Sequence, residues 1–411
     1  MSNTKAADNI KERRWRDSYP EIAAFEVGTE DMRSPELFAK ERDLVFKRAW
    51  IFAGLARDVE QPGSYFLREF PAWKGSIIIV RGNDGKVRGF HNVCRHRANK
   101  LVTRGEAKGT KRALVCEYHG WTNSPEGVLT HMPDPDGVMN ADGAGLIPVH
   151  TEVWQGFVFV NFEATPRETL PEFLGSIYSG SLSRYAFDKP WESWTWSTEL
   201  KANWKVILDL FSESYHLKFV HQESVARIYS NGDNPFGHYA ALKFDGMHRY
   251  SSVFGALQQK VGEMGQLTMK FGGGGMSRHR NEEVVRTAAP GTNPAQLKNW
   301  GFDSHTIFPN LQVSVFGGFW HYHYFLPIAH NRVLWEHRIS FPKATNAGQR
   351  FAQEYSRSLQ QIVAAEDSAV AESNQAGIEA AALPVMMLHD EEIKIRHTRQ
   401  QLAAYMARTG G

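Results

Sequence analysis

Two short Cys/His pairs constrain this sequence more than any other feature. One reads Cys94-Arg95-His96 and the other Cys116-Glu117-Tyr118-His119, and together they contain the only two cysteines of the chain. Each pair is short enough for one loop to present a thiolate and an imidazole. Two thiolates and two imidazoles suit a binuclear iron–sulfur cluster in which histidines replace cysteines on one iron, but they also suit tetrahedral zinc. The ligand types alone leave both metals open.

The composition is that of an ordinary globular protein and argues against several functions. Of 411 residues, 47 are basic and 45 acidic, and a net charge of +2 gives no support for nucleic-acid binding. The apolar runs are too short to span a bilayer. The N-terminus is polar and lacks the apolar core of a secretory signal, so we expect a cytoplasmic protein without a membrane partner. For such a chain a disulfide between Cys94 and Cys116 is unattractive.

Changes in patterning along the chain predict three regions. Residues 1–47 are rich in charge and helix formers, and residues 48–165 contain short strand-like runs separated by Gly, Pro, Asn and Asp. Residues 166–411 mix helical and strand-like segments, so we predict an α+β protein with a small all-β domain. Within the last region we expect helices over 202–222 and 350–376, two strands over 312–341 joined at 327–331, and a glycine loop at 272–275.

The residues around the two Cys/His pairs resemble the Rieske family. The family signature is Cys-x-His, a spacer of this size, and Cys-x-x-His, and the resemblance continues through Arg97 and through Gly120-Trp121-Thr122. One departure is Ala98, where many relatives carry glycine; it puts the loop geometry in doubt but touches no ligand. The resemblance implies a [2Fe–2S] cluster in an N-terminal all-β domain, held by Cys94, His96, Cys116 and His119.

A second group of candidate ligands follows Asn203-Trp204-Lys205. Glu213 and His216 are three residues apart and share a face of a helix, where the carboxylate could orient the imidazole. His216 and His221 are five apart, and on an ideal α-helix their rings diverge by about 140°. Both reach one metal only if the helix ends or bulges between them. The spacing alone therefore leaves a structural role open.

The same segment is similar to the catalytic-domain motif of Rieske non-haem iron oxygenases, the aromatic-ring-hydroxylating dioxygenase family. The resemblance implies a mononuclear Fe(II) held by His216, His221 and an aspartate late in the chain. Our candidate for that aspartate is Asp367, with the adjacent Glu366 as its rival. Two histidines and one carboxylate leave coordination positions open for dioxygen.

The resemblance also implies an assembly. Glu213 takes the place of the acid that links the iron site to His119 of the partner subunit, as part of the route for electrons. The implied alpha subunit has a helix-grip (START-like) catalytic domain with an antiparallel sheet, on which the N-terminal segment packs, and it forms a homotrimer, with a β subunit as the alternative. Its electrons come from NAD(P)H through a reductase, with or without a ferredoxin. One departure is Leu210, where relatives commonly carry asparagine.

Aromatic residues point to the kind of substrate. We expect a pocket with substantial apolar surface near the iron, formed by Phe211, Phe219, Trp320 and Tyr322. His321 and His323 form a His-x-His pair on a predicted strand, so both side chains point to one face. We favour pocket or core positions for this pair over metal binding.

Together these observations predict a terminal oxygenase that adds one or two oxygen atoms to an aromatic or other largely apolar small molecule. The alternative within the family is a monooxygenase or demethylase acting on an N-methyl, O-methyl or quaternary ammonium substrate. Two further classes are a Rieske electron carrier fused to a ligand-binding domain and a zinc-stabilised binding protein. The sequence does not distinguish the substrates.

Overall fold

The chain folds into two compact units. Arg42–Phe173 form the first, here called the β unit, and Met1–Glu41 with Leu174–Gly411 form the second, the α+β unit. Both predicted boundaries, residues 48 and 165, lie inside the β unit.

In the part of the chain that the structure describes, no helix is long and apolar enough to cross a membrane. In this computed structural model the described residues are 12–139, 142–230, 234–255, 262–271, 289–298 and 300–410, which leaves the predicted glycine loop outside.

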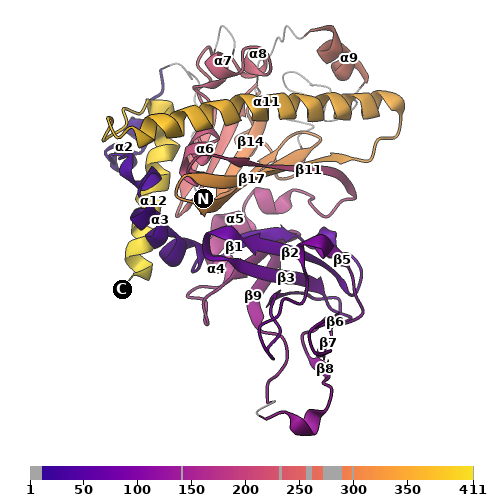
Figure 1. Ribbon diagram of the computed structural model, residues 1–411. Coiled ribbons are helices and arrows are strands. Elements are labelled where there is room, and N and C mark those ends of the chain that lie inside the picture. The colour runs from indigo at the N-terminus through magenta and orange to yellow at the C-terminus, as the bar shows by residue number, and fades with distance from the viewer. Residues whose placement is uncertain are drawn as a thin grey trace. The chain divides into compact units, whose positions relative to one another are not determined.

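The β unit is built from antiparallel strands, labelled in Figure 1. Its larger sheet has the order β1-β10-β9-β4-β3-β2-β5, with bounds Ile51–Leu55, Phe157–Asn161, Pro148–Trp154, Val87–His91, Gly75–Arg81, Ser64–Phe70 and Lys108–Thr110. A smaller sheet, β6-β7-β8, comprises Leu114–Val115, Thr122–Asn123 and Leu129–His131. The first Cys/His pair follows β4, and the second lies between β6 and β7. Both pairs therefore lie in connections that follow strands.

Short helical turns complete the β unit. Central strands such as β3 and β10 consist largely of buried β-branched and aromatic residues, which fit a pleated sheet. The turns have the bounds η2 Arg42–Phe46, η3 Ala56–Val59, η4 Pro71–Trp73, η5 Arg104–Glu106 and η6 Pro135–Gly137. Helix α4, Leu170–Leu174, lies at the boundary of the two units.

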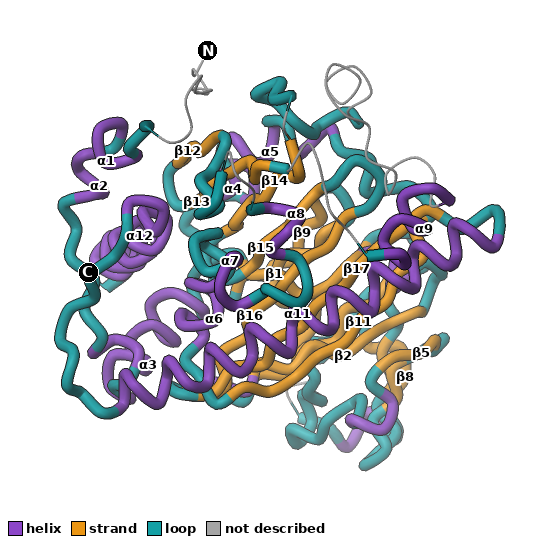
Figure 2. Tube along the Cα trace, turned by 90° about the horizontal axis from the view of Figure 1, so that it is seen from above, coloured by secondary structure: helices purple, strands orange, loops and turns teal. Residues whose placement is uncertain are grey.

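The α+β unit is organised around one antiparallel sheet. Its order is β11-β17-β16-β15-β14-β13-β12, with bounds Trp191–Leu200, Arg332–Pro342, Trp320–Ala329, Leu311–Val315, Trp300–Ile307, His248–Phe254 and Ala241–Asp245. The long helix α11, Ala347–Glu379, runs beside β11 and β17 in both Figures 1 and 2. A mostly antiparallel sheet covered on one face by helices confirms the predicted α+β class.

The other helices of this unit are shorter. Those that position the site are α6, Trp204–Leu210, and α7, Leu217–Val220, and the C-terminal helix is α12, Ile393–Thr409. The remaining ones are α1 Trp15–Ser18, α2 Pro20–Ala23, η1 Glu30–Met32, α3 Pro35–Glu41, α5 Ser176–Ser179, η7 Leu182–Arg184, α8 Ala226–Tyr229, α9 Glu263–Phe271 and η8 Asp390–Glu392.

Three predicted elements differ in detail from the structure. The helix expected over 350–376 is α11, but the one expected over 202–222 is two short helices with a break between them. The two strands expected over 312–341 are three, because Phe316 and Phe319 close an additional turn. Pro327 lies within β16 instead of in a turn. The register shifts between Pro327 and Ala329, and such a bulge accommodates a residue without an N–H.

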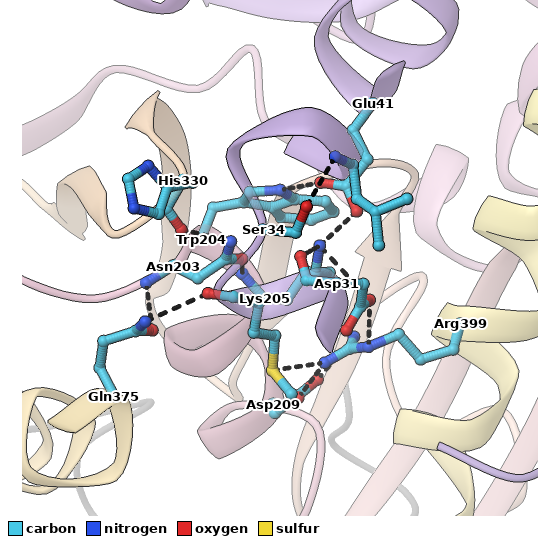
Figure 3. A network of polar contacts seen from close by, with 12 residues as sticks. Asp31, Ser34, Glu41, Asn203, Trp204, Lys205, Asp209, His330, Gln375 and Arg399 are labelled. Carbon is cyan, nitrogen blue, oxygen red and sulfur yellow. Dashed lines mark hydrogen bonds and ion pairs between the residues drawn. The ribbon is translucent and has the colours of Figure 1, made fainter. Parts of the chain in front are cut away.

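Helix α6 is anchored by buried polar contacts (Figure 3). At its start the Asn203 side chain caps the helix by accepting from the Lys205 N–H at 2.9 Å. The Lys205 ammonium is fully buried and pairs with the buried Glu41 carboxylate of the N-terminal segment. At its end Asp209 accepts from Arg399 of α12 at 2.5 and 3.2 Å. Glu41, Lys205 and Asp209 are all buried, and this burial raises the pKa of Glu41 and raises that of Asp209 to about 6.

Lys205→Met should strongly destabilise the α+β unit. The substitution leaves the buried Glu41 carboxylate without its partner, and breaking such a pair typically costs about 3–5 kcal/mol. Adding Glu41→Gln removes the stranded charge and should restore part of the loss, measured by denaturant unfolding followed by circular dichroism. Lys201→Met, at an exposed lysine just before the same helix, is the matched control. Equal stability of the Lys205 and Lys201 variants would contradict this account.

Candidate metal centres

The two Cys/His loops of the β unit have the same backbone geometry. In the first, the Cys94 N–H donates to Asn99 O at 2.8 Å and the Ala98 N–H donates to Cys94 O at 2.9 Å. In the second, the Cys116 N–H donates to Trp121 O and the Gly120 N–H to Cys116 O, each at 2.8 Å. The fourth residue after each cysteine has a left-handed backbone, with φ of 60° at Ala98 and 73° at Gly120. The two loops are therefore equivalent turns.

The thiols and the imidazoles of these loops are separated by depth. Cys94 and Cys116 belong to an apolar core cluster and are 3% and 2% exposed, whereas the two histidines are exposed. The His96 and His119 rings lie beside each other, with centroids 4.5 Å apart. Burial, with the neighbouring Cys116 thiol, raises the pKa of Cys94. The loops thus present a pair of sulfurs on the inside and a pair of nitrogens on the outside.

This separation fits a two-iron cluster better than one zinc ion. Four ligands of a tetrahedral zinc ion would all lie within about 4 Å of one another. Among the described residues, sets of three potential metal-binding side chains with all ligand atoms within 4.8 Å occur only in the α+β unit, so these four do not converge on one point. A Rieske cluster instead places two cysteines on one iron and two histidines on the other.

The break after α6 creates the second candidate centre. Leu210 ends α6, and the single helical turn of α7 is flanked by His216 and His221 as its capping residues. This geometry brings the His216 Nε2 and His221 Nε2 atoms to within 3.2 Å of each other, although five residues separate them. Asp367 comes from the buried stripe of α11. Its Oδ1 lies 3.2 Å from His221 Nε2 and 3.7 Å from His216 Nε2.

These three atoms form a triangle that suits one metal ion. Ligands at right angles and about 2.1 Å from an ion are separated by about 3 Å. Asp367 Oδ1 is buried and, within the described residues, has no hydrogen-bond partner, as expected of an oxygen reserved for a metal. The residues present therefore fit a mononuclear ion in a facial arrangement of two histidines and one carboxylate.

Two glutamates hold the outer nitrogens of the histidine rings. Glu213 Oε1 contacts His216 Nδ1, and its other oxygen accepts from the His216 backbone N–H at 3.0 Å. Glu366 Oε2 lies 2.6 Å from His221 Nδ1 and also accepts from the Ser224 hydroxyl at 2.6 Å. Burial opposes charge on His216, but the Glu213 carboxylate outweighs it and the pKa of His216 is raised. Such carboxylates fix the tautomer and the orientation of ligating rings.

The structure thus separates the two rival acids on α11. Asp367 faces the nitrogens that point at the centre, whereas Glu366 supports His221 from behind. Sequence reasoning treated Glu366 only as a rival ligand and missed Ser224, which is its second partner. A hydroxyl three residues after a ligating histidine is too common a pattern to have identified it.

The expected pocket residues do not come together. Phe211 packs on His323, with ring centroids 4.3 Å apart, on the sheet face that the helices cover. Trp320 and Tyr322 alternate with His323 along β16, so they lie on the opposite face; Trp320 there packs against Phe187. Trp320 and Tyr322 therefore do not face Phe211.

Phe219 differs from Phe211 in exposure. It is 55% exposed, whereas Phe211 is partly buried against the sheet. A helical turn as short as α7 buries only one side, so its phenylalanine could not be assigned to a face from the sequence.

The paired Cys/His turns and the His–His–Asp triangle, each in its own unit, define a Rieske-type protein with a second, non-haem iron domain. Two family models agree: the Rieske [2Fe-2S] domain matches residues 49–142 and the ring hydroxylating alpha subunit (catalytic domain) matches residues 189–408. The chain belongs to the ring-hydroxylating alpha subunit family, which confirms the resemblance seen in the sequence.

Proteins named for different substrates are similar to this chain in sequence or in structure. Chloroplastic choline monooxygenase of Atriplex hortensis is 32% identical over 197 residues, which cover 46% of this chain and 43% of the relative, so the match spans less than half of it. A quaternary ammonium Rieske monooxygenase, described for carnitine oxidation and inter-subunit electron transfer, has a TM-score of 0.72 at 20% identity, covering 98% of this chain and 100% of the other. Naphthalene 1,2-dioxygenase from Rhodococcus sp. has a TM-score of 0.75 at 18% sequence identity. The match covers 96% of this chain and 98% of the dioxygenase chain.

Ala98→Gly should stabilise the first Cys/His turn. An alanine in the left-handed region destabilises the folded state by about 1–2 kcal/mol, and glycine removes this cost. Glycine also gives the unfolded chain more freedom, which offsets part of the gain. We expect a gain of about 1 kcal/mol, seen as a higher midpoint for thermal loss of the cluster absorbance. Ala107→Gly, at a right-handed position of the same unit, should instead lower it. A lower midpoint for Ala98→Gly would contradict this reading of the turn.

Glu366→Gln should weaken metal binding at the triangle. The neutral amide is a poorer acceptor for His221 Nδ1–H, and losing such a partner typically costs about 10- to 100-fold in metal affinity. Cobalt(II) titration of protein depleted at this centre measures the affinity, and Glu354→Gln, on the exposed side of the same helix, is the control. Unchanged affinity would show that Glu366 does not orient the ring.

Proposed function

We propose that this chain is the oxygenase component of a Rieske non-haem iron oxygenase. Cys94, His96, Cys116 and His119 would hold the [2Fe–2S] cluster, and His216, His221 and Asp367 would hold Fe(II). The observation that carries the proposal is the joint presence of both ligand sets in one chain of this family. When bound, the cluster supplies electrons and the iron supplies open positions at which dioxygen is reduced.

The protein side chains keep this chemistry in place. Glu213 and Glu366 fix the two imidazoles, so that both Nε2 lone pairs point to one spot. Asp367, 3% exposed at its side chain, adds one negative charge in a site with little water. Water exclusion protects the reduced centre from side reactions and strengthens its electrostatics.

We further propose that the working unit is an oligomer, a homotrimer with a β subunit as the alternative. Glu213 would then join His216 to His119 of the partner subunit, giving electrons a hydrogen-bonded path. The inter-subunit electron transfer described for the quaternary ammonium monooxygenase supports this role. The electrons would come from NAD(P)H through a separate reductase, with or without a ferredoxin.

The substrate would be a small molecule bound between the sheet and its covering helices. Oxygenation of an aromatic or other largely apolar compound is our first candidate, and naphthalene dioxygenase shares the fold. Oxidation of a quaternary ammonium compound is the second, favoured by the similarity to choline monooxygenase.

A substrate panel tests the proposal. The holoenzyme would be supplied with NADH and a surrogate reductase and offered indole, naphthalene, choline and γ-butyrobetaine. Product carrying oxygen from labelled dioxygen, in proportion to oxygen uptake, is the expected result. Uptake without product marks uncoupled reduction, and electron transfer to the cluster without any oxygen uptake would instead indicate an electron carrier.

His216→Ala should abolish oxygenation and leave the Rieske spectrum intact. The variant removes one of three proposed ligands of the mononuclear centre, while the proposed cluster ligands lie in the other compact unit. Absorbance and electron paramagnetic resonance report the cluster, and product analysis reports turnover. His150→Ala, at an exposed histidine of the β unit, should change neither. Turnover in the His216 variant would remove this residue from the centre.

Glu213→Gln should slow electron transfer with both centres still bound. The amide retains the shape but not the charge of the bridging acid, and we expect a loss of about 10- to 100-fold, as for other groups that support ligands. The measurement is a single turnover of reduced protein, followed by reoxidation of the cluster absorbance. An unchanged rate, with iron content equal to that of the unmodified protein, would reject the bridging role.

A further inference from the structure

Five polar side chains gather on the sheet face that carries Phe211. Gln312 is the cross-strand neighbour of His323, and His323 that of His337, while Ser314 lies opposite His321. Directly opposed residues in antiparallel strands point to the same face, as do alternate residues along one strand. All five are buried. We call this set the polar patch: Gln312, Ser314, His321, His323 and His337.

The patch faces the helices of the α+β unit. His337 lies opposite Trp196 of β11, and Trp194 on the same face of β11 is covered by Arg350 and Arg357 of α11. Figure 2 shows α11 running over these strands. The patch therefore shares the layer between sheet and helix in which Asp367, also on α11, forms the metal triangle.

Hydrogen bonds fix one donor and one acceptor of the patch. The indole N–H of Trp335 donates to His323 Nδ1 at 3.1 Å. Since an indole only donates, the neutral His323 ring carries its proton on Nε2, which becomes a donor. Gln312 uses its Nε2 to donate to Ser304 Oγ at 2.8 Å, which leaves its Oε1 as an acceptor. Opposite positions on neighbouring strands thus present an N–H and a C=O.

Several patch atoms have no partner of their own. Within the described residues, no hydrogen bond reaches the buried atoms Gln312 Oε1, Ser314 Oγ and His337 Nδ1. Buried polar atoms without partners are costly, and a bound polar group would complete three of them in this one patch. His321 and His337 face each other at 3.2 Å and satisfy one nitrogen each.

The patch does not suit a metal ion. Ring nitrogens of the three histidines lie within 4.8 Å of one another, as at the iron triangle. However, to ligate through Nε2, His323 would have to move its proton to Nδ1, where the Trp335 N–H already points. Burial lowers the pKa of all three histidines, that of His321 to about 3, so the patch itself presents neutral hydrogen-bonding groups.

The patch is joined to the iron-binding segment by one aromatic ring. Phe211 contacts His323, Phe325 and Trp335, with centroids 4.3, 5.4 and 5.3 Å away. It follows α6 directly and precedes Glu213 by two residues. Phe211 thus connects the patch with the segment that carries Glu213 and His216.

We propose that the polar patch binds a neutral hydroxyl or carboxamide group on the non-reacting end of the substrate, which accepts from His323 Nε2–H and donates to Gln312 Oε1. The proposal rests on the oxygenase function and deepens it: the substrate class is one with a neutral group that both donates and accepts. Sites that hydrogen-bond such a group reject analogues that lack it, because their buried polar atoms are then left unpaired.

Binding of matched probes tests the patch. The holoenzyme is dialysed to equilibrium against phenol, benzamide or toluene, which share a ring and differ in the polar group. We expect phenol and benzamide to bind about tenfold more tightly than toluene, and Gln312→Leu to remove that preference. His323→Phe is the second variant, should the first fail to fold as judged by its cluster spectrum. Tyr322→Phe, on the opposite face of the same strand, is the control and should retain the preference.

Any result other than this pattern of probe binding would contradict the assignment of the patch as a substrate site. Equal binding of the three probes, including no binding of any, would do so, as would a preference that survives both variants. Metal beyond that of the two iron centres, lost in His323→Phe, would assign the histidines to a metal instead. Failure of the oxygenase function is distinct: it appears as phenol binding without oxygen uptake in the presence of reductase.

Discussion

Three polar ligand atoms can share one buried point only if the chain around them is held rigidly, because each prefers water when unpaired. Here the constraint falls on the segment after α6. The helix stops at Leu210, and one turn carries His216 and His221 to Asp367. The segment is fixed from behind by charge: Lys205 and Asp209, at the two ends of α6, are bound to Glu41 and Arg399 of distant segments (Figure 3). The segment with His216 and His221 follows this anchor in the chain.

In the described part of the β unit the ligand residues are held in place without buried ion pairs. Its thiols lie in an apolar core and its imidazoles at the surface, and two equivalent turns impose that order. A surface pair of imidazoles suits electron exchange with another protein, whereas the buried triangle suits chemistry that must exclude water. Glu213, on the α+β unit, would connect the two kinds of centre. The role that suits each ligand set therefore follows from how deeply that set is buried.

How far the sequence predicts these centres depends on the range of the contacts involved. The Cys/His pairs are local, so their spacing was enough to select them as candidate ligands, although it left zinc open beside an iron–sulfur cluster. His216 and His221 needed the break after Leu210, which no local signal marks. Asp367 and Glu366 are adjacent on a helix and point about 100° apart, and only packing of α11 decides which faces the histidines. The alternation along the strand places Trp320 and Tyr322 on one face, but it does not say which face of the sheet the helices cover. His337 joins the patch only through the pairing of β16 with β17.

The most direct test of a two-centre chain is its metal content read together with its spectra. Anaerobically purified protein should contain about three irons and two inorganic sulfides per chain, with the resonance of a reduced Rieske cluster. Nitric oxide should add the signal of a separate mononuclear iron, which His216→Ala removes while the cluster signal stays. A colourless protein containing zinc, or a Rieske signal without any mononuclear iron in fully loaded protein, would contradict the account.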